Sequence, residues 1–276
     1  GVAKFMAPAV TGLGLVEAVS DADILAYTDE NDSNSDGISG VASYVEAPDF
    51  FVPKAWNTAI NGKYIGRFGR KATAIDLLHQ TVNAYFNDMG ITSDFHTEDI
   101  YHVQMGASSG DNAPEPEVGK SSVLQNVFYL QTLKVPPRRN ENDAEVKAGE
   151  VLFTQIGCAA CHRPSLKTQK HSIAALSEQT FYPYSDFLLH DLGAELDDKY
   201  TEGSATTAEW RTTPLWGLGL SSSSQGNQAY YLHDGRAKTL PQTIEYHGGE
   251  GANSRQAFRN LSETEKTKVL RFLESL

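Results

Sequence analysis

The amino-acid sequence predicts a mainly α-helical protein whose helices are joined by long irregular loops. The first observation is a helix signal in residues 144–156, where apolar side chains recur at helical spacing. Asn142 or Asp143 can cap the start of this helix, and Gly157 can end it by adopting a left-handed backbone conformation. The second observation is a similar signal at the C-terminal end of the chain.

The C-terminal segment carries a helix-start signature. Ser262 and Glu265 form a capping box, in which each side chain binds a backbone N–H group that the helix leaves free. The apolar residues that follow at helical spacing are Val269, Phe272, Leu273 and Leu276. We therefore expect two amphipathic helices to enclose the segment between them, in which residues 165–230 form a long loop region.

Two further helices are expected in the first half of the chain. Residues 120–139 form an amphipathic pattern that Pro136 and Pro137 end. Residues 74–90 form another such pattern. Residues 110–120, which contain proline and glycine, are predicted to be a polar loop between the two helices.

Composition and charge exclude several classes of partner. The chain has 276 residues, enough for one large domain or two modest ones, and a formal net charge of −12. Nucleic acid and anionic membrane surfaces are therefore not expected partners, whereas a basic redox protein would be attracted. No apolar run approaches the roughly 20 residues of a membrane span. The chain begins GVAKFMAP, without an initiator methionine or a signal peptide, which we interpret as a processed or trimmed start.

The only two cysteines lie in the segment GCAACHRPS. Cys158, Cys161 and His162 form the C-x-x-C-H pattern that attaches c-type haem. In this chemistry the thiols add to the haem vinyl groups, and the imidazole becomes the proximal iron ligand. A disulfide, a zinc site and a dithiol redox pair are alternatives, but the sequence shows no further zinc motif and no flanking strands of a thioredoxin-like site. We therefore predict one covalent c-type haem.

The motif and its two enclosing helices together indicate a cytochrome c-like haem domain in residues 140–276. The helix expected at 120–139 resembles the last helix of a preceding cytochrome module, but no second C-x-x-C-H pattern lies upstream. We therefore expect residues 1–139 to be the remainder of a first cytochrome c-like module whose haem-bearing start this chain lacks. Covalent haem attachment needs an export-linked assembly system, which predicts a periplasmic or other extracytoplasmic location.

Segments along nearly the whole chain resemble the di-haem oxidoreductase family of peroxidase-type proteins, also labelled thiol oxidoreductases. The segments are GKYIGRFGRKA (62–72), FNDMGITSDF (86–95), the C-x-x-C-H motif, YSDFLLHDLG (184–193), EWRTTPLWGLGL (209–220) and YYLHDGRAKTLPQTIEYHGGEG (230–251). The family is distantly related to bacterial di-haem cytochrome c peroxidases and to a tryptophylquinone-maturing enzyme. The resemblance implies an N-terminal haem module with its own C-x-x-C-H motif, from which this chain departs.

The resemblance also implies which residue binds the second face of the haem iron. In the peroxidase relatives an aromatic-x-His-x-Gly segment precedes the distal ligand, and YLHDG places this reference histidine at His233. The position that matches the ligand is His247, followed by two glycines that would let the backbone pass close to the haem. His190 is the main rival for this role, and His233 is expected to support the haem environment. Arg211 matches an arginine that pairs with haem propionates in the relatives, and a surface arginine is the alternative.

Residues 29–40, DENDSNSDGISG, predict a calcium-binding loop. The core fits D-x-[DN]-x-[DN]-G, with oxygen ligands from Asp32, Asn34 and Asp36. The twelfth loop position is Ser43, where an EF-hand needs a bidentate glutamate, so the loop is not an EF-hand. It resembles the short calcium loops of extracytoplasmic proteins, and a solvated acidic turn is the alternative.

Together these features predict a c-type haem redox protein, the electron-transfer portion of a di-haem oxidoreductase. In the peroxidase relatives, peroxide reacts at the N-terminal haem while the C-terminal haem relays electrons. We therefore expect this chain alone to be an electron-transfer unit whose partner is a redox protein or the N-terminal haem module. Two alternatives remain: a dithiol–disulfide oxidoreductase that uses Cys158 and Cys161, and a non-enzymatic interaction module stabilised by calcium.

Overall fold

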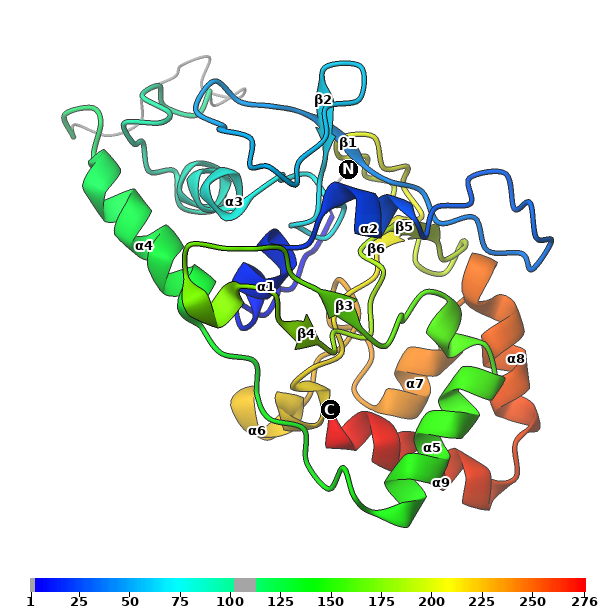
Figure 1. The fold of residues 1–276 in the computed structure, drawn as a ribbon. Coiled ribbons are helices and arrows are strands. Elements are labelled where there is room, and N and C mark those ends of the chain that lie inside the picture. The colour runs from blue at the N-terminus through cyan, green and yellow to red at the C-terminus, as the bar shows by residue number, and fades with distance from the viewer. Residues whose placement is uncertain (1–2, 102–112) are drawn as a thin grey trace.

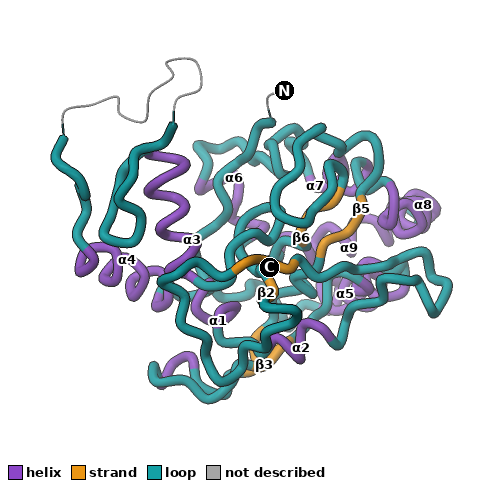
Figure 2. Tube along the Cα trace, turned by 90° about the horizontal axis from the view of Figure 1, so that it is seen from above, coloured by secondary structure: helices purple, strands orange, loops and turns teal. Residues whose placement is uncertain are grey.

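The structure is a computed structural model that describes residues 3–101 and 113–276. Helices and long irregular segments make up most of this part of the chain, as the sequence predicts (Figures 1 and 2). The helices are α1 (Leu13–Glu17), α2 (Asp21–Leu25), α3 (Leu77–Asn83), α4 (Lys120–Thr132), α5 (Ala144–Gln155), α6 (Ser221–Ser224), α7 (Leu240–Glu245), α8 (Ala252–Asn260) and α9 (Glu263–Ser275).

The strands in the described residues are short and form antiparallel pairs. They are β1 (Tyr44–Glu46) with β2 (Lys63–Ile65), β3 (Leu166–Lys167) with β4 (Thr180–Phe181), and β5 (Leu189–Asp191) with β6 (Glu209–Arg211). In the last pair, Leu189 lies opposite Arg211 and His190 lies opposite Trp210. The region 165–230, expected to be one long loop, therefore contains two strand pairs and the short helix α6.

The two helices with the clearest sequence signals form as predicted. The side chain of Asp143 caps α5 by accepting from two backbone N–H groups, and Gly157 follows the helix with a φ of 88°. At α9, both hydrogen bonds of the Ser262–Glu265 capping box are present. Each start signal therefore fixes where its helix enters the fold.

α5 and α9 cross at a point where only glycine fits. A Cβ atom on Gly149 of α5 would lie 2.0 Å from the carbonyl oxygen of Lys268 in α9. The missing side chain lets the two backbones meet, and the rings of Phe153 and Phe272 pack beside the crossing at 5.2 Å between centroids. These helices gather with α7 and α8 on one side of the molecule, while α3 and α4 lie on the other (Figures 1 and 2).

The other predicted helices differ at their ends. α4 stops at Thr132, before the prolines, because Leu133 is already extended. α3 begins at Leu77, since the side chain of Asp76 caps it there, and the helix continues as a π-helical turn over Ala84–Asp88. Of the expected loop 110–120, residues 110–112 lie outside the described part of the chain.

Two hydrophobic clusters form the interior. One lies around α1–α4, and the other lies around α5, α7 and α9. The first cluster also takes residues from the C-terminal half of the chain: Leu166, Phe181, Phe187, Leu188 and Trp216. The two cores therefore do not separate cleanly at residue 139, and the division into 1–139 and 140–276 stays a prediction. Among the residues described, no helix combines the length and apolar character needed to cross a membrane.

Candidate functional site

The predicted haem-attachment residues lie on one tight turn at the end of α5. Gly157 reverses the chain, and Cys158–Ala160 form a single 3₁₀ turn. The backbone N–H of His162 donates to the carbonyl of Cys158 over 3.0 Å, which closes the motif on itself. Neither cysteine is in a disulfide. The turn therefore places two free thiols and one imidazole together, as haem attachment requires.

The ring of His162 is held so that one nitrogen stays free. Its Nδ1 lies 2.8 Å from the carbonyl oxygen of Tyr184. Since a carbonyl only accepts, the proton sits on Nδ1 and Nε2 keeps its lone pair. Burial lowers the pKa of His162 to about 4, so the ring is neutral at neutral pH. In the described part of the chain, no group forms a hydrogen bond with Nε2 of His162.

His247 is held in the same way. It lies just after α7, whose start is capped by the side chain of Thr239. Its Nδ1 lies 2.7 Å from the carbonyl oxygen of Thr243 in that helix. Burial lowers the pKa of His247, and among the described residues nothing binds its Nε2. The two histidines are close enough that a charge on His247 would lower the pKa of His162.

A strained and buried segment carries the carbonyl that orients His162. Tyr184 and Phe187 have φ values of 50° and 62°, which non-glycine residues rarely adopt. The Tyr184 hydroxyl donates to Glu150 on α5 over 2.6 Å, and the Ser185 hydroxyl donates to the carbonyl of Thr212 over 2.7 Å. Backbone strain persists where surrounding contacts over-determine it, as these anchors do.

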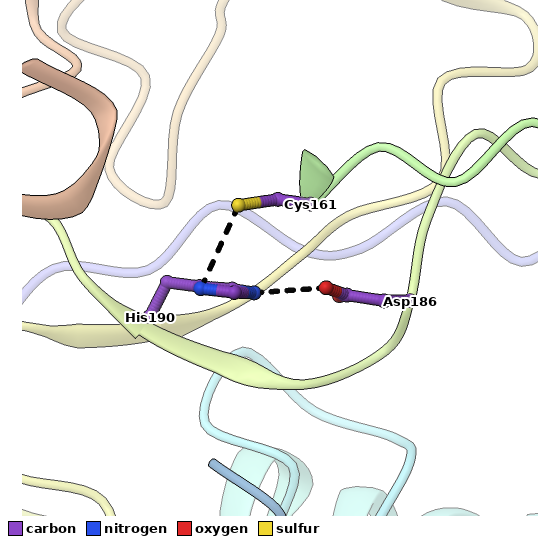
Figure 3. Close-up of side chains that lie close together, drawn as sticks. All are labelled: Cys161, Asp186 and His190. Carbon is purple, nitrogen blue, oxygen red and sulfur yellow. Dashed lines mark hydrogen bonds and ion pairs between the residues drawn. The ribbon is translucent and has the colours of Figure 1, made fainter. Parts of the chain in front are cut away.

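His190, the rival for the iron, is held between two carboxylates. Its Nε2 lies 2.9 Å from Asp186 Oδ2 and its Nδ1 lies 2.6 Å from Glu250 Oε2. The sulfur of Cys161 lies 3.6 Å from the same Nδ1 (Figure 3). Burial alone would lower the pKa of His190, but hydrogen bonds with Asp186, Cys161 and Glu250 raise it well above its usual value. Both nitrogens are therefore protonated and occupied, whereas His247 keeps one free.

Three of these residues also satisfy the geometry of a small metal site. One ligand atom each from Cys161, Asp186 and His190 lies within 4.8 Å of the other two. Cys161 and His190 were considered separately from the sequence, and no spacing motif joins them to Asp186 as one cluster. A metal there would need a free Cys161 thiolate, so it competes with a thioether at the same sulfur.

Arg211 is buried, and the acceptors of its hydrogen bonds are backbone carbonyls. Its Nε donates to the carbonyl of Gly69 over 2.8 Å and its Nη1 to the carbonyl of Thr212 over 3.2 Å. Within the described residues, it forms no ion pair with a carboxylate. Burial, together with the nearby charge of Arg70, lowers the pKa of Arg211 to about 9. Arg211 is therefore not a surface arginine, which was the alternative in the sequence analysis.

The remaining predicted residues pack against other parts of the protein. His233 is buried and stacks on Trp210, with 3.6 Å between ring centroids, and burial lowers its pKa to about 4. The glycines after His247 pack tightly against β5: a Cβ atom on Gly249 would lie 2.2 Å from the carbonyl oxygen of Asp191. The close approach that requires glycine is thus to protein backbone.

The acidic loop folds around its own backbone. Both carboxylate oxygens of Asp32 lie 3.2 Å from the N–H of Gly37, and Asn34 Oδ1 accepts from the N–H of Asp36 over 2.8 Å. The φ of Gly37 is 82°, which a glycine adopts without strain. The three predicted oxygen ligands therefore share one exposed turn. Ser43, where an EF-hand needs glutamate, instead lies against the hydroxyl of Ser204.

The groups that orient the imidazoles could not be recognised from sequence motifs. Two are backbone carbonyls, of Tyr184 and Thr243, which no side-chain motif announces. Asp186 and Glu250 were also missed, although Asp186 stands four residues before His190 and Glu250 three residues after His247. An acid at such spacing from a candidate histidine is the signal that would have found them.

Comparison with known proteins identifies one family. A family model described as "Di-haem oxidoreductase, putative peroxidase" matches residues 3–276. No curated protein matches the chain. Among solved structures, a hydrazine synthase from Kuenenia stuttgartiensis, pressurized with xenon, is similar at 14% sequence identity and a TM-score of 0.43, over 100% of this chain and 95% of that one.

Replacement of His190 by glutamine should weaken the pH dependence of stability. The raised pKa of His190 means that its charged form stabilises the fold fully below its ordinary value of 6.5, and this contribution is lost as the pH rises through the raised value.

The pKa of Glu250 is lowered: burial opposes this, but hydrogen bonds with His190 and Ser39 prevail. Its contribution is present above its ordinary value of 4.5 and is lost as the pH falls through the lowered one.

Urea unfolding of the parent and the variant at a series of pH values checks this expectation. The parent should lose more stability than the variant as the pH rises above about 6.5. Parallel curves for the two proteins in that range would contradict the charged state assigned to His190.

Proposed function

Because the chain belongs to the di-haem oxidoreductase family, we propose that this haem redox protein carries one covalent c-type haem and passes single electrons. The observation that carries the proposal is a pair of half-buried, neutral imidazoles whose Nε2 atoms bind no other described residue, together with two thiols outside any disulfide. Cys158 and Cys161 would form the thioethers, and His162 would be the proximal ligand. The haem, when bound, supplies a reversible one-electron change of its iron.

The residues around the pocket would tune that change. His247 would occupy the second axial position and so close the site to outside ligands. The carbonyls of Tyr184 and Thr243 fix the tautomers of the two imidazoles and raise their basicity. Arg211 would pair with a propionate. A site with no open position suits electron relay rather than reaction with peroxide, so this chain would serve as the electron-transfer unit of a di-haem peroxidase-type oxidoreductase.

The proposed partner follows from the electron-relay role of this haem. An electron-relay haem needs a donor or an acceptor within reach, which would be a redox protein or an N-terminal haem module. The net charge of −12 favours a basic partner surface over nucleic acid. We place the protein in the periplasm or another extracytoplasmic space, because that is where c-type haem is attached.

The dithiol alternative is weakened by the environment of the two cysteines. Burial raises the pKa of Cys158 to about 12. Burial also raises the pKa of Cys161, against the nearby charge of His190. The thiolate is the reactive species, so such thiols would attack a disulfide slowly at neutral pH. Their environment suits cysteines whose sulfur is bonded to a haem carbon as a thioether.

Calcium is the second proposed cofactor. Asp32, Asn34 and Asp36 keep side-chain oxygens together on one exposed turn, and calcium prefers such oxygen ligands. The turn leads to Ser39, whose N–H and hydroxyl bind Glu250 near His247. A calcium ion would therefore stabilise the N-terminal half of the chain and its contact with the segment around His247. The alternative function, a non-enzymatic interaction module stabilised by calcium, would need the same ion.

Replacing Cys158 and Cys161 by alanine should abolish haem retention in denaturant, since no thioether would remain. Haem staining of a denaturing gel, and the intact mass of each protein, measure this directly. The parent made with an export-linked maturation system is the positive control. Haem that stays with the double variant after denaturation would show that attachment is elsewhere.

Changing His247 should alter the iron in two distinguishable ways. His247→Met should raise the reduction potential and keep the iron low-spin, because a thioether donates less strongly than imidazole. His247→Gly should give a high-spin ferric spectrum and allow cyanide to bind. His171→Gly, outside the pocket, is the control. A low-spin signal with two imidazoles that persists in His247→Gly would assign the ligand to another residue.

Calcium should raise the melting temperature of the parent. Binding to the folded state contributes about 2.7 kcal/mol of stability at a calcium concentration of 100 Kd. Asp32→Asn combined with Asp36→Asn should remove this response, whereas Asp49→Asn, at an exposed carboxylate elsewhere, should keep it. Calorimetry with calcium and with a chelator measures the difference, and an unchanged parent would favour the solvated acidic turn.

A further inference from the structure

We propose that the triad Asp186–His190–Glu250 is a clamp that positions the two proposed axial histidines relative to one another. The inference rests on the proposed function, because it assigns a role toward the haem iron to residues that would not bind it. In this account His190 is a positioning residue. It links the segment that orients His162 to the loop that carries His247.

On the proximal side, the clamp is fastened to the haem-attachment turn. The N–H of Asp186 donates to the carbonyl of Cys161 over 3.0 Å. Two residues earlier in the same buried segment, the carbonyl of Tyr184 accepts from His162. The carboxylate of Asp186 receives Nε2–H of His190 over 2.9 Å and the N–H of Leu188 over 3.0 Å. A movement of His190 would therefore pull on the segment that holds the proximal imidazole.

On the distal side, the clamp is fastened to the loop after His247. Glu250 stands three residues beyond that histidine and accepts Nδ1–H of His190 over 2.6 Å. The same carboxylate receives the hydroxyl of Ser39 over 2.6 Å, with the N–H groups of Ser39 and Asp191 at 3.2 Å each. Gly249 lies directly against the carbonyl of Asp191. The loop after His247 thus contacts β5 both through the backbone of Gly249 and through the side chain of Glu250.

Burial makes the clamp strong and costly to open. His190 is 3% exposed and Asp186 is 1% exposed, so neither charge can be compensated by water. Removing one member would leave a buried charge without its partner, which destabilises far more than losing an exposed pair. The triad therefore resists the loop movement by which His247 would leave the iron.

The pattern of bonds favours a clamp over a metal site at the same place. A histidine that binds a metal leaves at least one nitrogen without a proton, but both nitrogens of His190 face carboxylates. The carboxylate of Glu250 also accepts hydrogen bonds from the N–H and hydroxyl of Ser39 and from the N–H of Asp191. The cluster of Cys161, Asp186 and His190 would bind a metal only after these contacts were broken.

The test measures how easily the distal imidazole leaves the iron. Carbon monoxide can bind the reduced haem only when His247 has dissociated, so its binding rate reports the stability of that position. Glu250→Gln keeps the shape of the side chain and removes the charge that grips His190. Loss of a hydrogen bond to a charged group changes an equilibrium constant by about tenfold or more. We therefore expect the rate of carbon monoxide binding to rise roughly tenfold or more.

Glu245→Gln is the matched control. Glu245 lies two residues before His247 but binds Arg259 at the exposed surface. Its replacement should leave the carbon monoxide rate within about twofold of the parent. The ferric spectrum is a second readout: only Glu250→Gln should gain a high-spin fraction. The combination of Glu250→Gln with His190→Gln should be far from additive, because both open one clamp.

The outcomes separate the clamp from the proposed function. A parent with covalent haem and equal rates in parent, Glu250→Gln and control would overturn the clamp alone, whereas a parent without covalent haem would overturn both. One zinc ion per chain, with an unmodified Cys161 thiol, would replace the clamp by a metal site. If Glu250→Gln does not fold, Ser39→Ala takes its place, with a smaller rate increase expected and an unchanged rate overturning the proposal.

Discussion

The hydrogen bond from His162 Nδ1 to the carbonyl of Tyr184 is the constraint on which the rest of the site depends. It fixes the proton on Nδ1 and so leaves Nε2 with its lone pair. The carbonyl can do this only because residues 184–187 are held in a strained, buried conformation, anchored on α5 by the Tyr184 hydroxyl. α5 in turn is placed by its close crossing with α9 at Gly149.

Two electrostatic requirements are met side by side in the same interior. The two histidines proposed as iron ligands must be neutral to bind iron, and burial lowers the pKa of both. Close to His162, His190 is kept charged by carboxylates on either side, although it is more deeply buried than His162 or His247. The difference lies in the partners of each ring: a carbonyl leaves an imidazole neutral, whereas a pair of carboxylates stabilises the imidazolium.

The features that the sequence predicts correctly are local ones. The caps of α5 and α9 and the turn at Gly157 depend on neighbours within a few residues, so spacing alone reveals them. The end of α4 and the strand pairs in 165–230 depend on distant contacts and were missed. The clamp joins residues 39, 161, 186, 190 and 250, and no spacing rule relates these positions. His247 as the sixth ligand came from family resemblance, and the structure adds the orientation of its ring.

The most direct test of the account is the spin and ligation state of the iron in the ferric parent protein. Low-temperature EPR and resonance Raman spectra of the protein, isolated after maturation with covalent haem, would measure it. The account predicts a six-coordinate, low-spin iron with two imidazole ligands, and no shift of the spectrum when cyanide is added at moderate concentration. A five-coordinate, high-spin iron that binds cyanide readily would contradict it.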